Sequence, residues 1–292
     1  MARVAMLFGR AHIESDEDDG FREEARAAED LEIETHTLDL DLVVDGEAEL
    51  AVEELPRKRL YVYRGAILTE EEYASLEEAV ADRGARLLVD ARAYARATYV
   101  PEWYEALEGH TPRTVWIEGT DADELWELAT RELPPPPWIV KDHVKSAKEA
   151  WLRACFVPAG ADREALARTC AALVEARGER FERGLVAREH VALRELGYRT
   201  PERAVCDEHR LFFVDSELVA QAPYHDIDDV EPLDPRELRF LRGVIESPFY
   251  CVDVARTADG GLTVIEVNDG GIATLPAAMD PRELFEALKT VE

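Results

Sequence analysis

Basic residues, and lysine above all, are scarce in this chain of 292 residues. Its 34 Lys and Arg residues face 63 Asp and Glu residues, which gives a formal net charge of −29 at pH 7. A field of this sign repels phosphate backbones, so the composition excludes a protein that binds nucleic acid through bulk electrostatics. Any phosphate ligand must therefore be held by a local cluster of cations.

Cysteine is rare too. The four cysteines, at 155, 170, 206 and 251, are far apart and form no CxxC pair, which argues against a zinc ribbon and a disulfide framework. No apolar run reaches the length of a transmembrane helix, and the first run, residues 4–8, is too short for a signal peptide. We therefore expect a cytoplasmic protein with no membrane partner.

Motifs of several common enzyme classes are missing as well. The chain has no GxGxxG, so a dinucleotide site has no support. Its seven histidines show neither HxH nor HExxH spacing, and no serine lies in a GxSxG motif. A histidine zinc site and a nucleophilic hydrolase are therefore not indicated.

What is present over the first third of the chain is an alternation of apolar runs and helical patterns. Strands are predicted at residues 4–8, 31–38, 59–63, 85–89 and 114–117, and helices at 69–81 and 122–133. The first helix begins with a capping box from Thr69 to Glu72. This βαβ rhythm predicts an α/β domain with a mostly parallel, Rossmann-like sheet.

Four prolines at residues 134–137 form a stiff, extended segment that we interpret as a domain boundary. The patterns beyond it predict strands at 138–142 and 185–193, a helix at 161–177, and two strands within 204–222. Asp234 and Asp280 each precede Pro-Arg-Glu-Leu, which predicts two helices with an Asp N-cap and Pro at the first position. The second half is therefore α+β with antiparallel hairpins.

The most informative segment is residues 249–276, where two alternating runs flank Asp259-Gly260. A two-residue turn there places Asp253 opposite Glu266, with Asn268 on the same face. The core face would carry Val252, Val254, Ile265 and Val267. Opposed carboxylates repel each other, and a Mg²⁺ ion, which prefers such oxygen ligands, would remove that cost. A solvated polar face, or a one-residue bulge that shifts the register, is the alternative.

Three of the five lysines, Lys141, Lys145 and Lys148, fall within eight residues, whereas 29 arginines are spread along the chain. Lysine is a compact, flexible point charge that suits phosphate oxygens. We interpret the cluster as a clamp for nucleotide phosphates, and chance clustering on an exposed face is the alternative.

Three further side chains are candidates with an ordinary alternative each. Arg210 begins an alternating strand and could point to the cleft of the metal face or to solvent. Glu189 could contact ribose or adenine, or be a solvated strand residue. Arg64, at a strand end, could contact a substrate carboxylate or form a structural salt bridge.

Taken in order, these residues resemble the ATP-grasp superfamily. The strand ending in Lys141, the strand with Glu189, Arg210 and the closing hairpin follow its order, and IEVNDGG is similar to its metal-binding signature. Three segments look most like the clade named for one arginine and two lysines. They are YRGAILTEEEY (63–73), WIVKDHVKSAKEAW (138–151) and VIEVNDGGIATLP (264–276). The resemblance covers nearly the full length.

This resemblance implies a Rossmann-like domain at residues 1–133 followed by a two-lobed ATP-grasp fold, with a small lobe at 138–184 and a C-terminal lobe with the metal site at 185–292. It implies ATP and Mg²⁺ as cofactors. It also implies a carboxylate–amine ligase that activates a carboxylate as an acyl phosphate, which an amine of an amino acid, peptide or protein then attacks. A nucleotide-binding regulatory module without turnover and a phosphotransferase are the alternatives.

The resemblance assigns site roles by position. Asp253, Glu266 and Asn268 would hold Mg²⁺, and Lys141 and Lys145 would contact the nucleotide phosphates. The other nucleotide contacts would be Glu189 and Arg210.

Arg210, Lys145 and Arg256 are the catalytic candidates, with Arg210 stabilising the transferring phosphate or the acyl phosphate. The first domain and the loops around Arg64 and Arg256 are expected to shape substrate specificity. One feature departs from many ATP-grasp enzymes, which have a Gly-rich mobile loop over the phosphates. Residues 142–157 contain no Gly. Either the lysines replace backbone donors here or other contacts hold the loop.

The excess of acid generates a first prediction. Self-repulsion at −29 destabilises the compact state, and salt screens it beyond about 8–10 Å near physiological ionic strength. The melting temperature should therefore rise between low salt and a few tenths molar NaCl, while the same screening weakens ATP binding at the lysines. Differential scanning fluorimetry and calorimetry would measure the two. A melting temperature that is flat or falls with salt would mean that the acids are already paired with arginines.

Overall fold

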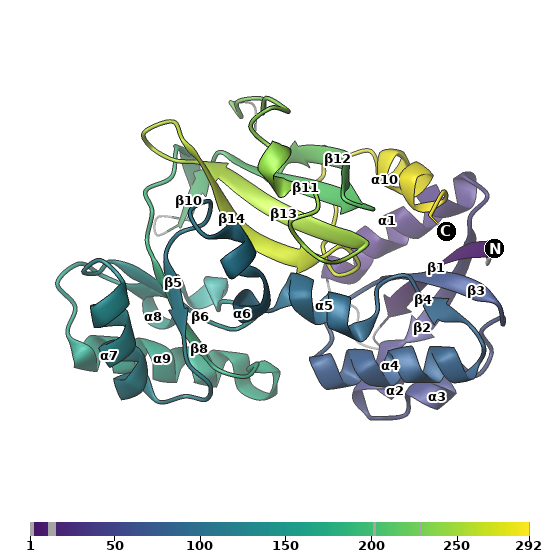
Figure 1. The fold of residues 1–292 in the computed structure, drawn as a ribbon, viewed down its shortest axis with the longest axis horizontal. Coiled ribbons are helices and arrows are strands. Elements are labelled where there is room, and N and C mark those ends of the chain that lie inside the picture. The colour runs from purple at the N-terminus through teal and green to yellow at the C-terminus, as the bar shows by residue number, and fades with distance from the viewer. Residues whose placement is uncertain (1–2, 11–15, 201–202, 228, 292) are drawn as a thin grey trace.

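A computed structural model describes residues 3–10, 16–200, 203–227 and 229–291 (Figure 1). Its strands are β1 (Arg3–Arg10), β2 (Glu34–Asp39), β3 (Arg59–Arg64), β4 (Arg86–Leu87), β5 (Thr114–Trp116), β6 (Trp138–Asp142), β7 (Phe156–Val157), β8 (Leu185–Glu189), β9 (Glu195–Thr200), β10 (Arg203–Cys206), β11 (Glu208–Val214), β12 (Glu217–Pro223), β13 (Phe249–Arg256) and β14 (Leu262–Asp269).

The α-helices are α1 (Asp16–Asp30), α2 (Leu40–Val44), α3 (Ala48–Ala51), α4 (Glu70–Asp82), α5 (Ala91–Thr98), α6 (Val100–Trp103), α7 (Ala122–Glu132), α8 (Trp151–Ala154), α9 (Arg163–Arg177) and α10 (Pro281–Leu288). Short 3₁₀ turns are η1 (Glu105–Leu107), η2 (Lys148–Ala150), η3 (Gly178–Arg180) and η4 (Arg239–Leu241). None of the helices in the described ranges is long and apolar enough to cross a membrane.

The first four strands form the predicted parallel sheet, in the order β2-β1-β3-β4. Its central strand β1 is buried along its middle, as a parallel strand covered on both faces should be. Figure 1 shows α1 on one side of this sheet and α4 on the other. The capping box that begins α4 is present, because Thr69 accepts from the Glu72 N–H and Glu72 from the Thr69 N–H.

The second sheet, in the order β5-β8-β6-β7, is antiparallel and forms the small lobe at the left of Figure 1. It contains β5, which the sequence analysis placed in the first domain, and β8, which it placed in the C-terminal lobe. Helix α7 also belongs here, because its Leu125 and Ala129 share a core with Leu166 of α9. The four prolines therefore lie inside this lobe rather than at its border, and the expected boundary at residue 133 separates elements that pack together.

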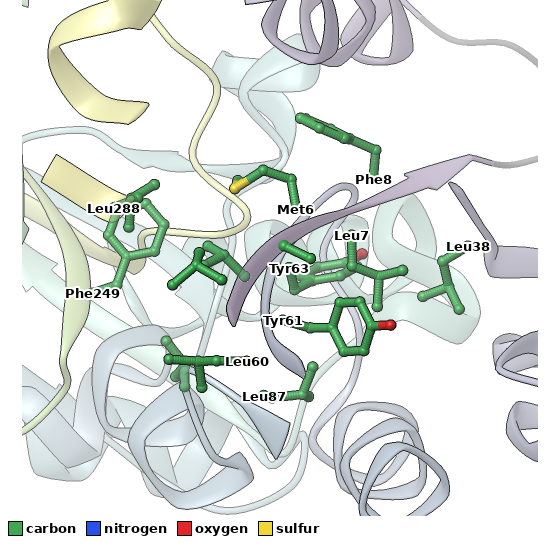
Figure 2. Close-up of a cluster of buried hydrophobic side chains, with 14 of the residues drawn as sticks. Met6, Leu7, Phe8, Leu38, Leu60, Tyr61, Tyr63, Leu87, Phe249 and Leu288 are labelled. Carbon is green, nitrogen blue, oxygen red and sulfur yellow. The ribbon is translucent and has the colours of Figure 1, made fainter. Parts of the chain in front are cut away.

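The third sheet, in the order β12-β11-β13-β14, is antiparallel and has a core on each face. One face packs Val252 and Val267 against Trp103 of α6. The other packs Phe212 and Phe249 against the parallel sheet and α10. Figure 2 shows part of this shared core, with Phe249 and Leu288 beside the strands of the first domain. The C-terminal sheet therefore has a hydrophobic core on each face, one shared with the parallel sheet and α10 and the other with α6.

One predicted helix does not form. After Asp280 the chain makes α10 as expected, with the Asp280 carboxylate capping and Pro281 in the first turn. After Asp234 it makes only turns and η4. The buried Leu238 and Leu241 lie three residues apart there, a spacing that an α-helix and a 3₁₀ turn share, so the apolar pattern did not distinguish the two.

Arg64 forms a buried ion pair with Glu24. Its side chain is fully buried and donates from Nε and Nη2 to the Glu24 carboxylate of α1, at 2.7 and 2.6 Å. Its Nη1 donates to the carbonyls of Gly270 and Ala273, in the loop after β14. Arg64 therefore joins the first domain to the end of the C-terminal hairpin, and this use of its donors favours the structural alternative over contact with a substrate.

Replacing Arg64 with Ala should lower the free energy of unfolding by about 3–5 kcal/mol, because Glu24 would become an uncompensated buried charge. Urea unfolding followed by tryptophan fluorescence would measure the loss. The matched control is Arg153→Ala, which breaks an ion pair with Glu175 whose side chains are 62% and 73% exposed. That change should cost less than about 1 kcal/mol. Equal losses in both variants would contradict the structural role of Arg64.

Candidate active site

The metal-type side chains of the hairpin lie on one face, as predicted. Asp253 of β13 is the direct partner of Glu266 on β14, and Asn268 follows two residues on, opposite Cys251. Asp253, Glu266 and Asn268 are all buried. Two carboxylates therefore face each other on a buried surface of the sheet, next to an amide.

The connection between the two strands differs from the expected two-residue turn. The strands end at Arg256 and resume at Leu262, and the Thr257 N–H donates to the Gly261 carbonyl across the loop. A register shift after Asp253 leaves Ile265 without a partner on β13, because Val254 pairs with Val264. Val264 therefore occupies the core where Ile265 was expected. The bulge lies on the turn side of Glu266, so the pairing with Asp253 persists.

Two lysines of the small lobe reach this face from β6 and the loop after it. Lys141 Nζ lies 3.2 Å from Glu266 Oε1, and Lys145 Nζ lies 2.9 Å from Asn268 Oδ1. Burial lowers the pKa of Lys141 to about 8, although Glu266 opposes the shift. Burial alone would raise the pKa of Glu266, but Lys145, Lys141 and Lys148 together hold it well below its usual range. Glu266 is therefore ionised and ready to bind a cation.

The lysine loop without glycine is held by Asp142, a residue that the sequence analysis did not single out. The fully buried Asp142 carboxylate accepts from the N–H groups of Val144 and Lys145 and, at 2.8 Å, from Arg177 Nε. An aspartate directly after a strand often closes such a turn, which is the signal that could have revealed it. Contacts of the Asp142 side chain, rather than glycine residues, therefore fix the backbone position of Lys145.

Arg210 of β11 lies on the same face and forms a two-pronged ion pair with Asp253. Its Nε and Nη2 each lie 2.8 Å from the carboxylate, and its guanidinium stacks over the Tyr224 ring. Glu208 is a further member of this group. Burial, with Asp253 nearby, raises the pKa of Glu208 to about 7. Strand alternation from Arg210 could have identified it.

Glu189 and Arg256 lie apart from this group. Glu189 ends β8 on the side of Trp138, whereas Lys141 shares the other face of the small sheet with Val186, and the nearest cation to Glu189 is Arg113 at 3.9 Å. Arg256 alternates with Asp253 to the opposite face of the C-terminal sheet. There its side chain bonds both oxygens of Glu237 at 2.8 Å. The structure therefore does not bring Arg256 to the carboxylates of Asp253 and Glu266.

The donor set suits a magnesium ion bound together with a nucleotide. Among the described residues no three His, Cys, Asp or Glu side chains lie where they could hold a metal alone. Asp253, Glu266 and the Asn268 amide oxygen supply only part of an octahedral shell. The Asn268 oxygen accepts a hydrogen bond from Lys145 Nζ. Mg²⁺ commonly takes one or two carboxylates plus substrate phosphates and water, so the residues present fit that ion.

A family model for an ATP-grasp domain matches residues 131–288, more than half of the chain. This chain belongs to the ATP-grasp family. The model describes family 3 of the clade named for one arginine and two lysines, so the suspected clade is confirmed. The match spans the β6 lysines, Arg210 and the whole C-terminal hairpin. A search of curated proteins returns no match.

Solved structures of similar fold are ATP-grasp proteins and ligases. A RimK domain ATP-grasp protein from Sphaerobacter thermophilus DSM 20745 is 16% identical, with a TM-score of 0.55 and coverage of 91% of this chain and 92% of that one. The ligase PsnB, complexed with minimal precursor, Mg and ADP, is 13% identical, with a TM-score of 0.58 and coverage of 97% and 96%. D-cycloserine synthetase DcsG is 12% identical, with a TM-score of 0.66 and coverage of 98% of both chains. At these identities the likeness shows the ATP-grasp fold.

Lys141 generates a prediction with a pH dependence. Lys141→Met should weaken binding of ADP with Mg²⁺ by about 1–3 kcal/mol at pH 7, the scale of a lost charge-assisted contact. The pKa of Lys141 is lowered to about 8, so it is protonated at pH 7 and loses its charge as the pH rises past 8. The affinity of the unaltered protein should therefore fall more steeply between pH 7 and 9 than that of the variant.

Isothermal titration calorimetry would measure both affinities. The control is Lys289→Met, because Lys289 Nζ bonds the Leu31 carbonyl on the exposed surface. This control should leave ADP binding unchanged. Affinity of the unaltered protein that is independent of pH over this range would contradict the role of Lys141.

Proposed function

We propose that this ATP-grasp protein is an ATP- and Mg²⁺-dependent ligase that joins a carboxylate, activated as an acyl phosphate, to an amine. The observation that carries the proposal is the convergence of cations from two sheets on one acidic strand pair. Lys141 and Lys145 arrive from the small lobe and Arg210 from the C-terminal sheet, all facing Asp253 and Glu266. Phosphoryl transfer needs this combination of positioning and charge neutralisation.

In this proposal Asp253, Glu266 and Asn268 would hold Mg²⁺, which would supply positive charge to neutralise the charge that develops on the nucleotide phosphates. Lys141 and Lys145 exchange their present bonds to Glu266 and Asn268 for bonds to phosphate oxygens. Lys141, Asp253 and Glu266 are buried, and the low dielectric around them strengthens their electrostatic contacts.

In the proposed reaction Arg210 stabilises the transferred phosphoryl group. A substrate carboxylate oxygen attacks the terminal phosphorus of ATP, and ADP leaves. The amine nitrogen then attacks the carbonyl carbon of the acyl phosphate, and inorganic phosphate leaves with the electron pair of the broken C–O bond. Arg210 carries five N–H donors and is held in place by Asp253, Tyr224 and the Thr274 carbonyl, so it can meet the negative charge in both steps.

The two lobes also suggest where the substrates bind. Glu189 ends β8 beside the start of β6 but on the opposite face of the small sheet from Lys141, so we assign it no ribose or adenine contact. The carboxylate and the amine would enter from the side of the parallel sheet, whose β3 ends next to the loop after β14. Another structure of PsnB is complexed with the precursor peptide PsnA2, and DcsG is a D-cycloserine synthetase, which supports peptide or small-molecule substrates.

The test incubates the protein with ATP, Mg²⁺ and hydroxylamine, and with one amino acid or dipeptide at a time as the carboxylate. The release of ADP is measured for each carboxylate. Hydroxylamine traps an acyl phosphate as a hydroxamate that can be detected by mass spectrometry. We expect ADP release that depends on one class of carboxylate and a matching hydroxamate, both lost in Glu266→Gln. ADP release with a stable phosphorylated product and no hydroxamate would indicate a phosphotransferase. ATP binding without turnover on any carboxylate would indicate a regulatory module.

A further inference from the structure

Arg188 is a buried cation that neither the sequence pattern nor the proposed reaction uses. It lies in the middle of the small-lobe sheet on β8, shares the inner face of that sheet with Lys141, and is 7% exposed. In the described part of the chain the contacts of Arg188 are with Thr114, Ile265 and Trp103 rather than with a carboxylate, and its Nη2 has no hydrogen-bond partner there. Such a group is costly to bury, so its contacts need an explanation.

The contacts of Arg188 run between the two lobes. Its Nε donates to Thr114 Oγ1 of the neighbouring strand β5 at 3.0 Å, and its guanidinium lies over the Trp103 ring. Its Nη1 donates to the main-chain carbonyl of Ile265 on β14. Arg188 therefore fastens the small-lobe sheet to the outer edge of the C-terminal sheet.

Ile265 is the bulged residue directly before Glu266. Strand β14 is an edge strand, so its outer carbonyls need partners from outside the sheet. Residues 110–111 bond Val264: the Val264 N–H donates to the His110 carbonyl, and the Val264 carbonyl accepts from Thr111 Oγ1. The Ile265 carbonyl accepts from Arg188. Without the bulge, Ile265 would occupy the core position that Val264 now fills.

We infer that Arg188 is a positioning residue for Glu266: it holds the bulge at Ile265 and thereby aims the Glu266 carboxylate at the Mg²⁺ site. This inference rests on the proposed function, in which Glu266 is a metal ligand. A rigid fork explains why the position carries an arginine, because the same side chain must bond Thr114 and Ile265 at once. Arg188 also couples the position of the small lobe on the C-terminal sheet to the orientation of Glu266.

The alternative is that Arg188 acts on Glu266 only through its charge, and the two accounts differ in sign. A nearby cation competes with Mg²⁺, so removal of the charge alone would strengthen metal binding. Loss of positioning would weaken it. Three variants separate the accounts: Arg188→Lys keeps the charge and loses the fork, Arg188→Met loses both, and Thr114→Val removes one anchor without a change in charge.

Binding of Mn²⁺ to the full-length protein with ADP present is the measurement, followed by the electron paramagnetic resonance signal of the free ion against ADP alone and by Mg²⁺ competition. We expect Mn²⁺ affinity to fall about tenfold in Arg188→Lys and Arg188→Met, the lower end of the range for partners that orient metal ligands, and by a smaller factor in Thr114→Val. Arg163→Met removes an arginine that is 46% exposed on α9 and should change nothing.

The outcomes keep this inference separate from the proposed function. If the unaltered protein with ADP binds no Mn²⁺ beyond what ADP alone binds, or Glu266→Gln binds it equally well, the metal site itself is wrong. If Glu266→Gln loses Mn²⁺ but Arg188→Lys and Thr114→Val bind it normally, the positioning role is overturned. Stronger binding in Arg188→Met would also overturn it in favour of charge competition. Arg188→Lys and Thr114→Val still decide the question if Arg188→Met does not fold.

Discussion

The opposed carboxylates of Asp253 and Glu266 are the constraint on which the rest of this structure depends. Two like charges on adjacent strands of a buried sheet face are unfavourable unless cations meet them. Here Arg210 meets Asp253 from the same sheet, and Lys141 meets Glu266 from the small lobe. The Lys141–Glu266 pair therefore joins the two lobes across the site. In the proposed function a nucleotide and its metal would replace this pair, which would couple ligand binding to the lobe arrangement by charge.

Much of this site could be predicted from the sequence because strand alternation and charge are local signals. The Asp253–Glu266 pairing, the face of Asn268 and strand β6 at 138–142 all follow from spacing. What failed depended on tertiary contacts. The bulge at Ile265 is stabilised by Arg188 from another lobe, and no local pattern indicates it. Arg256 was expected at the site, but alternation from Asp253 puts it on the opposite face, where Glu237 holds it.

The same division explains the fold. The parallel sheet of β1 to β4 could be predicted from the alternation of buried strands and helices, whereas the position of β5 could not. Strand β5 continues the βαβ rhythm in sequence but pairs with the distant strand β8, at Val115 and Ala187. Membership of the ATP-grasp family rests on the segment from 131 to 288, which holds the lysine strand, Arg210 and the hairpin. Solved structures share this fold at identities of 11–16%, so the fold is retained while most side chains differ.

A crystal structure of the full-length protein with Mn²⁺ and ADP tests the central claim most directly, because the anomalous signal of manganese locates the ion independently of its ligands. The account predicts an anomalous peak bonded to oxygens of Asp253, Glu266 and Asn268 and to an ADP phosphate, with Lys141 and Lys145 turned from Glu266 and Asn268 to the phosphates. A peak elsewhere, or Glu266 still bonded to Lys141 with ADP bound away from both carboxylates, would contradict it.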